Sequence, residues 1–184
     1  PTPSSALLHS ATMVKAGVYL LFRLSPALFG TMTGTMVSFI GGLTFLLASL
    51  LAISKSDAKA VLAYSTISNL GLIVACAGVG MRETIWAAIY LLIFHAVSKA
   101  MMFQDVGAVE NSLHSRNIEN MQGLIYRLPR LAFIMLIGIA GMYLAPFGML
   151  IAKWAAFKAF VDASNPLVFE SPDIYKNSLR TVII

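Results

Sequence analysis

The sequence contains few charged residues. Only 11% of its 184 residues are Asp, Glu, Lys or Arg, whereas 58% are hydrophobic, and the mean hydropathy is +0.80. Soluble globular domains carry about 25% charged and about 45–50% apolar residues. So little charge excludes a disordered chain and a nucleic-acid-binding domain, and it argues against an ordinary soluble enzyme. The composition predicts an integral membrane protein.

Cysteine and the motifs of cofactor chemistry are also scarce. The single cysteine, Cys76, lies in an apolar run, which excludes a disulfide framework within the chain and a metal site of clustered cysteines. There is no Gly-rich phosphate loop, no His/Cys cluster with metal-ligand spacing and no triad-like grouping. We assign Asp105 and Glu110 to a loop, which leaves no convincing acid within a span. We therefore expect no cofactor, no metal and no redox catalysis in this chain itself.

Long apolar runs make up most of what is present. A helix that crosses about 30 Å of hydrocarbon needs about 20 apolar residues. We expect five such segments, over residues 6–22, 36–53, 60–79, 84–103 and 131–161. The last would be about 46 Å long as one straight helix, and Pro146 lies in its middle. The predicted fold class is all-α, a polytopic transmembrane helix bundle with a discontinuous helix near Pro146.

Local features refine these segments. Arg23 and Pro26 are expected to close the first span, and Gly41-Gly42 should let a neighbouring helix approach the second closely. Apolar sequence begins at Ala6 and continues to the last residue, Ile184. We therefore expect residues 1–184 to form a single membrane-domain fragment of a longer polytopic protein, without a separate soluble domain.

The basic residues predict an orientation. The net charge of +5 fits the flanks of membrane helices, so nucleic acid is not expected as a partner. Loops 54–60 and 104–130 would share one face and carry most of the basic residues: Lys55, Lys59, Arg116, Arg127 and Arg130, against Arg23 and Arg82 on the other. The positive-inside rule then places loops 54–60 and 104–130 in the cytoplasm.

Ionisable residues within the expected spans are the candidates for function, because each charge at a helix centre costs about 2.5–3.5 kcal/mol or more. His95 and Lys99 are four residues apart, so both side chains point from one face of their helix. A buried amine beside an imidazole offers two adjustable proton sites, as a proton relay needs. The alternative is that Lys99 extends to the headgroups while His95 bonds a neighbouring helix.

Lys153 follows Pro146 by seven residues, and broken helices build ion sites at membrane depth because they free backbone groups. The alternative is a kink with an interfacial lysine, which is how we interpret Lys158. His9 and Lys15 share the first span but lie six residues apart, so they face different neighbours. Lys15 is the deeper and costlier of the two, and His9 could simply bond the loop or cap the helix. The candidate proton-translocation residues are His95, Lys99, Lys153, His9 and Lys15.

Several motifs carry a specific resemblance. Residues 1–20 (PTPSSALLHSATMVKAGVYL), 57–66 (DAKAVLAYST) and 94–103 (FHAVSKAMMF) occur in that order. They resemble the antiporter-like proton-translocating subunits of respiratory complex I, energy-converting hydrogenases and Mrp-type cation/proton antiporters. Residues 146–154 (PFGMLIAKW) look most similar to the hydrogenase-associated branch. The resemblance covers roughly residues 1–160.

The resemblance implies roles for the candidates. His9 matches the histidine at the start of the helix that follows the family's first broken helix. His95 and Lys99 match its central relay, and Lys153 matches the lysine of its second broken helix. A second histidine that some members carry four residues before His95 is Leu91 here. The family fold is a pair of inverted five-helix repeats, of which this chain resembles the junction and most of the second.

We therefore expect a proton-translocating membrane subunit of a redox-driven complex, either NADH:quinone oxidoreductase-like or an energy-converting hydrogenase. Its expected partners are other membrane subunits, the lipid bilayer and H+, with Na+ as a second ion, and its expected location is the cytoplasmic (inner) membrane, crossed several times. The alternatives are a Na+/H+ antiporter subunit of the Mrp type and a structural membrane scaffold whose lysines only extend to the headgroups.

Overall fold

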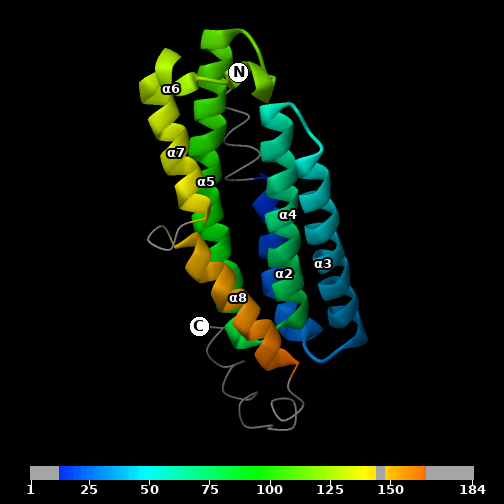
Figure 1. The fold of residues 1–184 in the computed structure, drawn as a ribbon. Coiled ribbons are helices and arrows are strands. Elements are labelled where there is room, and N and C mark those ends of the chain that lie inside the picture. Colours follow the sequence, from blue (N-terminus) through cyan, green and yellow to red (C-terminus); the bar gives the residue numbers. More distant parts are fainter. Residues whose placement is uncertain (1–12, 144–147, 165–184) are drawn as a thin grey trace.

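The computed structural model describes residues 13–143 and 148–164, which form a bundle of α-helices (Figure 1). The seven α-helices of this part of the chain, with one short 3-10 helix, run in the order α2 (Met13–Leu28), α3 (Met32–Ile53), α4 (Ala58–Val79), α5 (Arg82–Leu113), η2 (Ile118–Met121), α6 (Leu124–Arg127), α7 (Pro129–Tyr143) and α8 (Met149–Ala163). The all-α fold class expected from the sequence is confirmed.

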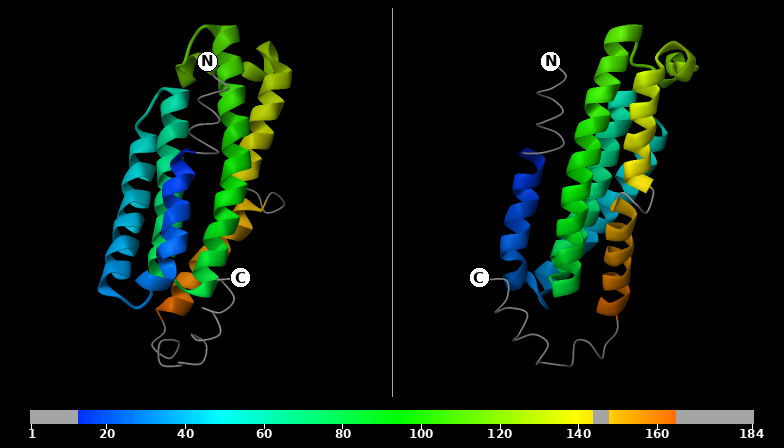
Figure 2. Two further views of the ribbon diagram at one scale, coloured as in Figure 1. Left: turned by 180° about the vertical axis from the view of Figure 1, so that it is seen from behind. Right: turned by 90° about the vertical axis from the view of Figure 1, so that its left-hand side faces the viewer.

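Three of the described helices, α3, α4 and α5, are long and apolar enough to cross a membrane, and α7 is a shorter apolar helix. The described helices stand side by side, with α5 between α4 and the α7–α8 pair, and with α2 packed against α4 (Figures 1 and 2). The start of α4, the end of α5 and α6 lie at one end of the bundle (Figure 2). A multi-helix apolar bundle of this kind fits a bilayer, where every backbone group must be satisfied within a helix.

Helix α2 extends beyond the expected first span, which we had ended at Phe22, with Arg23 and Pro26 as its stop. It continues to Leu28 with Pro26 inside it. Proline has no N–H to donate to the carbonyl four residues earlier. The Ser25 hydroxyl donates to that carbonyl of Phe22 instead, at 2.8 Å. A local polar side chain thus replaces the missing backbone bond, and the helix does not stop where the sequence suggested.

Helices α3 and α4 pack backbone against backbone through glycine. A Cβ added at Gly41 would lie 2.5 Å from the Ala75 nitrogen, and one at Gly78 would lie 2.5 Å from the Ser38 nitrogen. The close approach expected at Gly41-Gly42 is therefore real at Gly41, whereas Gly42 has no such neighbour within 4 Å. Small residues of this kind let membrane helices associate by van der Waals packing.

Helix α5 is longer than expected. The sequence predicted a span over 84–103 and a loop over 104–130, but α5 continues to Leu113, and η2, α6 and the start of α7 occupy much of the remainder. The loop prediction is wrong for residues 104–113. The hydropathy of this segment is low because it contains Gln104, Asp105 and Glu110. Asp105 and Val109 are nevertheless buried, so these polar residues belong to a packed helix and do not indicate a loop.

The last expected span, 131–161, is divided between α7 and α8. Helix α7 ends at Tyr143 and α8 begins after Gly148, whose φ of 79° is left-handed. Glycine adopts this conformation without steric cost. Pro146, on which we based the discontinuity, lies outside the described residues. The helices on either side are nonetheless separate, as a discontinuous helix requires (Figure 1).

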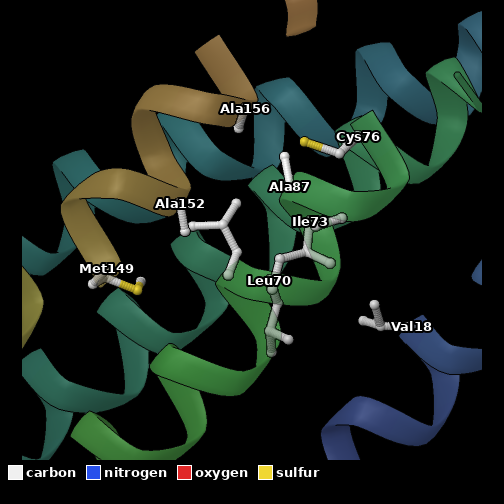
Figure 3. Close-up of a cluster of buried hydrophobic side chains, with 10 residues drawn as sticks. Val18, Leu70, Ile73, Cys76, Ala87, Met149, Ala152 and Ala156 are labelled. Carbon is white, nitrogen blue, oxygen red and sulfur yellow. The ribbon is translucent and has the colours of Figure 1, made fainter. Parts of the chain in front are cut away.

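The apolar core joins four helices. Val18 of α2, Leu70 and Ile73 of α4, Leu91 of α5 and Met149 of α8 belong to one buried cluster (Figure 3). Several members contributed by α5 and α8 are alanines, so these two helices approach each other closely. A tight apolar layer thus fixes α2, α4, α5 and α8, the four helices that carry the candidate site.

Candidate functional site

Lys99 is the most deeply buried candidate. Its side chain has 0% exposure, and its Nζ donates to the Leu62 carbonyl oxygen at 3.2 Å and to the Ser65 hydroxyl, both on α4. It therefore crosses from α5 to α4 within the bundle and does not extend to the bundle surface. The headgroup alternative considered for Lys99 does not describe this geometry.

The α4 segment facing Lys99 is rich in oxygen. The Leu62 carbonyl also accepts from the Ser65 hydroxyl at 3.0 Å and from the Thr66 hydroxyl at 2.8 Å. One turn further, Asn69 donates to the Ser65 carbonyl at 2.7 Å. Hydroxyls that bond backbone carbonyls of their own helix remain able to accept a proton donor from a neighbour. This segment of α4 thus provides the acceptors for the buried amine.

His95 lies one turn before Lys99 on α5 and is also 0% exposed. Neither ring nitrogen hydrogen-bonds to any atom in the described structure, and the same holds for the Asn69 Oδ1 atom on α4. Buried polar groups in native proteins almost always have a partner in protein or ordered water. These three atoms on α4 and α5 therefore keep unused hydrogen-bonding capacity inside the described bundle.

Lys15 reaches the same stretch of α5 from α2. It is 8% exposed, and its Nζ donates to the Leu92 carbonyl oxygen at 3.2 Å. Leu92 precedes His95 by three residues, so Lys15 and His95 lie beside the same turn of α5. His9, expected to accompany Lys15 in the first span, lies outside the described residues.

Lys153 is on α8, in the first turns after the break. It is partly buried, and its Nζ lies 5.4 Å from the centroid of the Tyr143 ring at the end of α7. A cation over an aromatic face is attracted by the ring quadrupole. The lysine therefore contacts the helix on the other side of the discontinuity. Lys158, which we interpreted as an interfacial lysine, is exposed.

The basic side chains form one electrostatic group. The charges of Lys99, Lys15 and Lys153 all act on His95, and the charge of Lys153 also acts on Lys99. Three helices besides α4 contribute to this group: α2, α5 and α8. Four of the five sequence candidates thus come together, although they are spread over residues 15–153. A proton gained or lost by one member changes the energy of charge on the others.

An ion-pair cluster closes one end of the bundle. Glu110 near the end of α5 pairs with Lys59 at the start of α4 and with Arg116 beyond α5, and this pairing raises the pKa of Arg116. Backbone bonds join the same two chain segments, from the Ala58 nitrogen to the Arg116 carbonyl at 3.1 Å and from the Ile118 nitrogen to the Ser56 carbonyl at 2.9 Å. Sequence reasoning missed this cluster because it treated residues 104–130 as one loop.

Asp105 was also missed. We assigned it to a loop, but it lies within α5 and is 4% exposed. Helical periodicity counted beyond Phe103 would have revealed it, because Asp105 follows Ser98 by two turns. Among the described residues, no group of three or more His, Cys, Asp or Glu side chains is arranged to hold a metal ion.

Comparison with known proteins gives a consistent result. Residues 1–170 match the family described as NADH:quinone oxidoreductase/Mrp antiporter, TM. A protein named as an antiporter subunit, mnhA2, from Staphylococcus aureus (strain MRSA252) is 39% identical over 162 residues, 80% of this chain and 20% of its own length. The protein of the same name from strain USA300 / TCH1516 is 38% identical over an equal stretch.

The fold comparison agrees. A chain in the structure of the Mrp complex from Dietzia sp. DQ12-45-1b has a TM-score of 0.81 and 39% sequence identity, over 90% of this chain and 18% of that one. The present chain therefore spans about a fifth of the length of these relatives.

Proposed function

This chain belongs to the NADH:quinone oxidoreductase/Mrp antiporter transmembrane family, and we propose that it is part of an Mrp-type cation/proton antiporter subunit in which buried lysines and a histidine carry protons. The observation that carries the proposal is Lys99, a fully buried amine bonded to the oxygen-rich face of α4. As a member of this family it is a multi-pass membrane protein.

The relatives favour the antiporter over the redox-driven complex expected from the sequence. The mnhA2 proteins are named as antiporter subunits, and the structural match is an Mrp complex. The hydrogenase-like residues 146–154 are a short stretch, whereas the similarity to mnhA2 extends over 162 residues. We therefore propose Na+/H+ exchange, with other membrane subunits of an Mrp complex as partners.

The geometry suggests how protons move. Lys99 in its charged form donates to Leu62 and Ser65 on α4, and loss of its proton weakens both bonds. His95 has two ring nitrogens free to exchange a proton within the described bundle. A neutral imidazole both donates and accepts, so it can pass a proton between neighbours. Because the charges of Lys99, Lys15 and Lys153 all act on His95, and that of Lys153 also acts on Lys99, the protonation of these groups is coupled.

The scaffold alternative requires lysines that only extend to headgroups. Lys158 fits that description, since it is exposed on α8. Lys99 does not, and Lys15 bonds a backbone carbonyl of α5 instead. A buried amine kept for packing alone would be costly, because an apolar residue of similar size would fill the space without desolvating a charge.

The test uses the full-length subunit within its complex. Everted membrane vesicles are energised, and Na+/H+ exchange is followed by a pH-sensitive dye after addition of NaCl. We expect Lys99→Met to reduce the exchange rate at least tenfold, with the complex still assembled. Lys158→Met, on an exposed lysine, is the matched control and should exchange like the wild type.

Two outcomes would contradict the proposal. If Lys99→Met exchanges at the wild-type rate, the buried amine is not on the proton path, and the structural scaffold becomes the favoured alternative. If the dye responds only while electrons flow through the complex, and sodium has no effect, the redox-driven reading is the correct one.

A further inference from the structure

One buried acid lies apart from the basic group. Asp105 of α5 is 4% exposed, and neither carboxyl oxygen has a hydrogen-bond partner in the described structure. The proton path proposed above does not use it. An ionised carboxylate that is buried without a cation or hydrogen-bond donor is strongly disfavoured. A neutral, protonated carboxyl group is the form that fits this environment.

The position of Asp105 follows from the contacts of α5 with α7 and α8. A Cβ at Gly148 would lie 2.4 Å from the Phe94 ring, and one at Gly141 would lie 3.2 Å from the Ser98 hydroxyl. Asp105 is seven residues, or two turns, beyond Ser98, so it lies on the same face of α5. Glycines hold the α7 backbone against this face, and Asp105 is the acid on it.

The charged and titratable groups of the surrounding elements do not hydrogen-bond to the Asp105 carboxyl group. Around this half of α5 they are Lys59 and Tyr64 on α4, Glu119 on η2, Tyr126 and Arg127 on α6, Arg130 and Tyr143 on α7, and Lys99 and Glu110 on α5 itself. None of them hydrogen-bonds to Asp105. Lys59 pairs with Glu110, Lys99 donates to α4, and Arg127 and Arg130 are exposed.

Asp105 also lies between the buried lysine and the bundle end. It follows Lys99 by six residues and precedes Glu110 by five, about 9 Å and about 7.5 Å along the helix axis. Glu110 belongs to the ion-pair cluster at that end, where its side chain is 17% exposed. In the described part of α5, Asp105 is thus the buried titratable residue between Lys99 and the Glu110 end of the bundle.

From this placement we propose that Asp105 is a proton-binding site, which holds a proton while α7 packs against α5 and exchanges it with water at the Glu110 end during transport. In release, the carboxyl O–H bond breaks, the proton passes to water and a carboxylate remains; reloading is the reverse. This proposal rests on the proposed function, since it supplies the step between solvent and the buried lysines.

The first readout is independent of transport. Infrared difference spectra of the assembled complex, recorded in H2O and D2O, detect the carbonyl stretch of a protonated carboxyl group. We expect a band that Asp105→Asn removes and that Asp162→Asn, on an exposed acid of α8, leaves in place. A spectrum unchanged by Asp105→Asn would overturn the proposal, because it would mean that Asp105 holds no exchangeable proton in the complex.

The second readout is the exchange rate in the same vesicles. Asn is close to Asp in shape and is neutral, so packing against α7 is kept while proton exchange is lost. We expect Asp105→Asn to reduce Na+/H+ exchange about tenfold and Asp105→Glu to restore part of it. Wild-type exchange in Asp105→Asn would overturn the proposal, since a merely structural carboxyl is replaced by its amide without loss.

The two proposals fail separately. If the wild-type complex exchanges no cation for protons, the proposed function fails, and the infrared band still reports whether Asp105 binds a proton. If Lys99→Met abolishes exchange but Asp105→Asn does not, the antiporter proposal survives and the role of Asp105 is rejected.

Discussion

At the scale of single residues, burial separates side chains that the sequence treats alike. Lys99, Lys153 and Lys158 are all lysines of apolar segments, yet the first is fully buried, the second partly buried and the third exposed. The i, i+4 spacing of His95 and Lys99 could be predicted, because it depends on helix geometry alone. Their acceptors on α4 could not, since these depend on how two helices are placed against each other.

Ser65 gives a residue-scale prediction. Its hydroxyl accepts from Lys99 and donates to the Leu62 carbonyl, so Ser65→Ala leaves the amine with one described acceptor. Loss of a buried partner costs about 1–3 kcal/mol, and we expect the free energy of unfolding in mixed detergent to fall by about that amount. Exchange should slow severalfold. Ser112→Ala, on an exposed serine with a similar backbone bond, should change neither quantity.

Asp105 shows why part of the site could not be predicted. Hydropathy averages the residues of a segment over all faces of a helix, so one acid near Gln104 and Glu110 made the segment look like a loop. The carboxyl is buried because one face of α5 lies against α7 through Gly138 and Gly141. That contact joins residues more than 30 positions apart, and no local pattern contains it.

At the scale of the helices, the sequence predicts the presence of a helix better than the residue at which it ends. The apolar runs correctly predicted α3, α4 and the division between α7 and α8. The ends of α2 and α5 were wrong for different reasons: in α5, polar residues suggested a loop although Asp105 is buried within the helix. In α2, Pro26 does not end the helix, and the Ser25 hydroxyl donates to the Phe22 carbonyl that the proline leaves without its backbone donor.

The glycine contacts between α3 and α4 give an element-scale prediction. The Cβ of Gly41→Ala would lie 2.5 Å from backbone nitrogen, so the helices must separate, and overpacking of this kind costs about 1–3 kcal/mol. Gly42→Ala meets nothing within 4 Å and gains about 1 kcal/mol of helix propensity. The free energy of unfolding of the subunit in mixed detergent should therefore be highest for Gly42→Ala, intermediate for the wild type and lowest for Gly41→Ala. Equal stability of the two variants would mean that α3 and α4 do not pack at this glycine.

At the scale of the whole molecule, the order of the motifs predicted the family, and the long apolar runs predicted the fold class. Composition could not distinguish which ion is exchanged or which complex the chain belongs to. Those distinctions depend on the rest of the parent subunit, of which this chain spans about a fifth. Within the described part, the Lys59–Glu110–Arg116 cluster joins the start of α4, the end of α5 and the segment after α5 at one end of the bundle.

This arrangement predicts the labelling pattern of the parent subunit. The segments before α4 and after α5 lie at one end of the bundle, joined by the bridge between Asp57 and Asn117. The turn between α4 and α5 lies at the opposite end, because α5 is long enough to cross the membrane. In a subunit otherwise free of reactive cysteine, Ser56→Cys and Glu119→Cys should therefore react with a membrane-impermeant maleimide from the same side. Glu83→Cys should react from the other.

The positive-inside rule further places Ser56→Cys and Glu119→Cys on the cytoplasmic side, so they should react in everted vesicles and Glu83→Cys in intact cells. Cys76 is fully buried and should give little background. Labelling of all three from one side would contradict a membrane-crossing α5. The reversed pattern would keep the fold and reject only the orientation; the Glu110 end, where we propose that Asp105 exchanges its proton, would then face the outside.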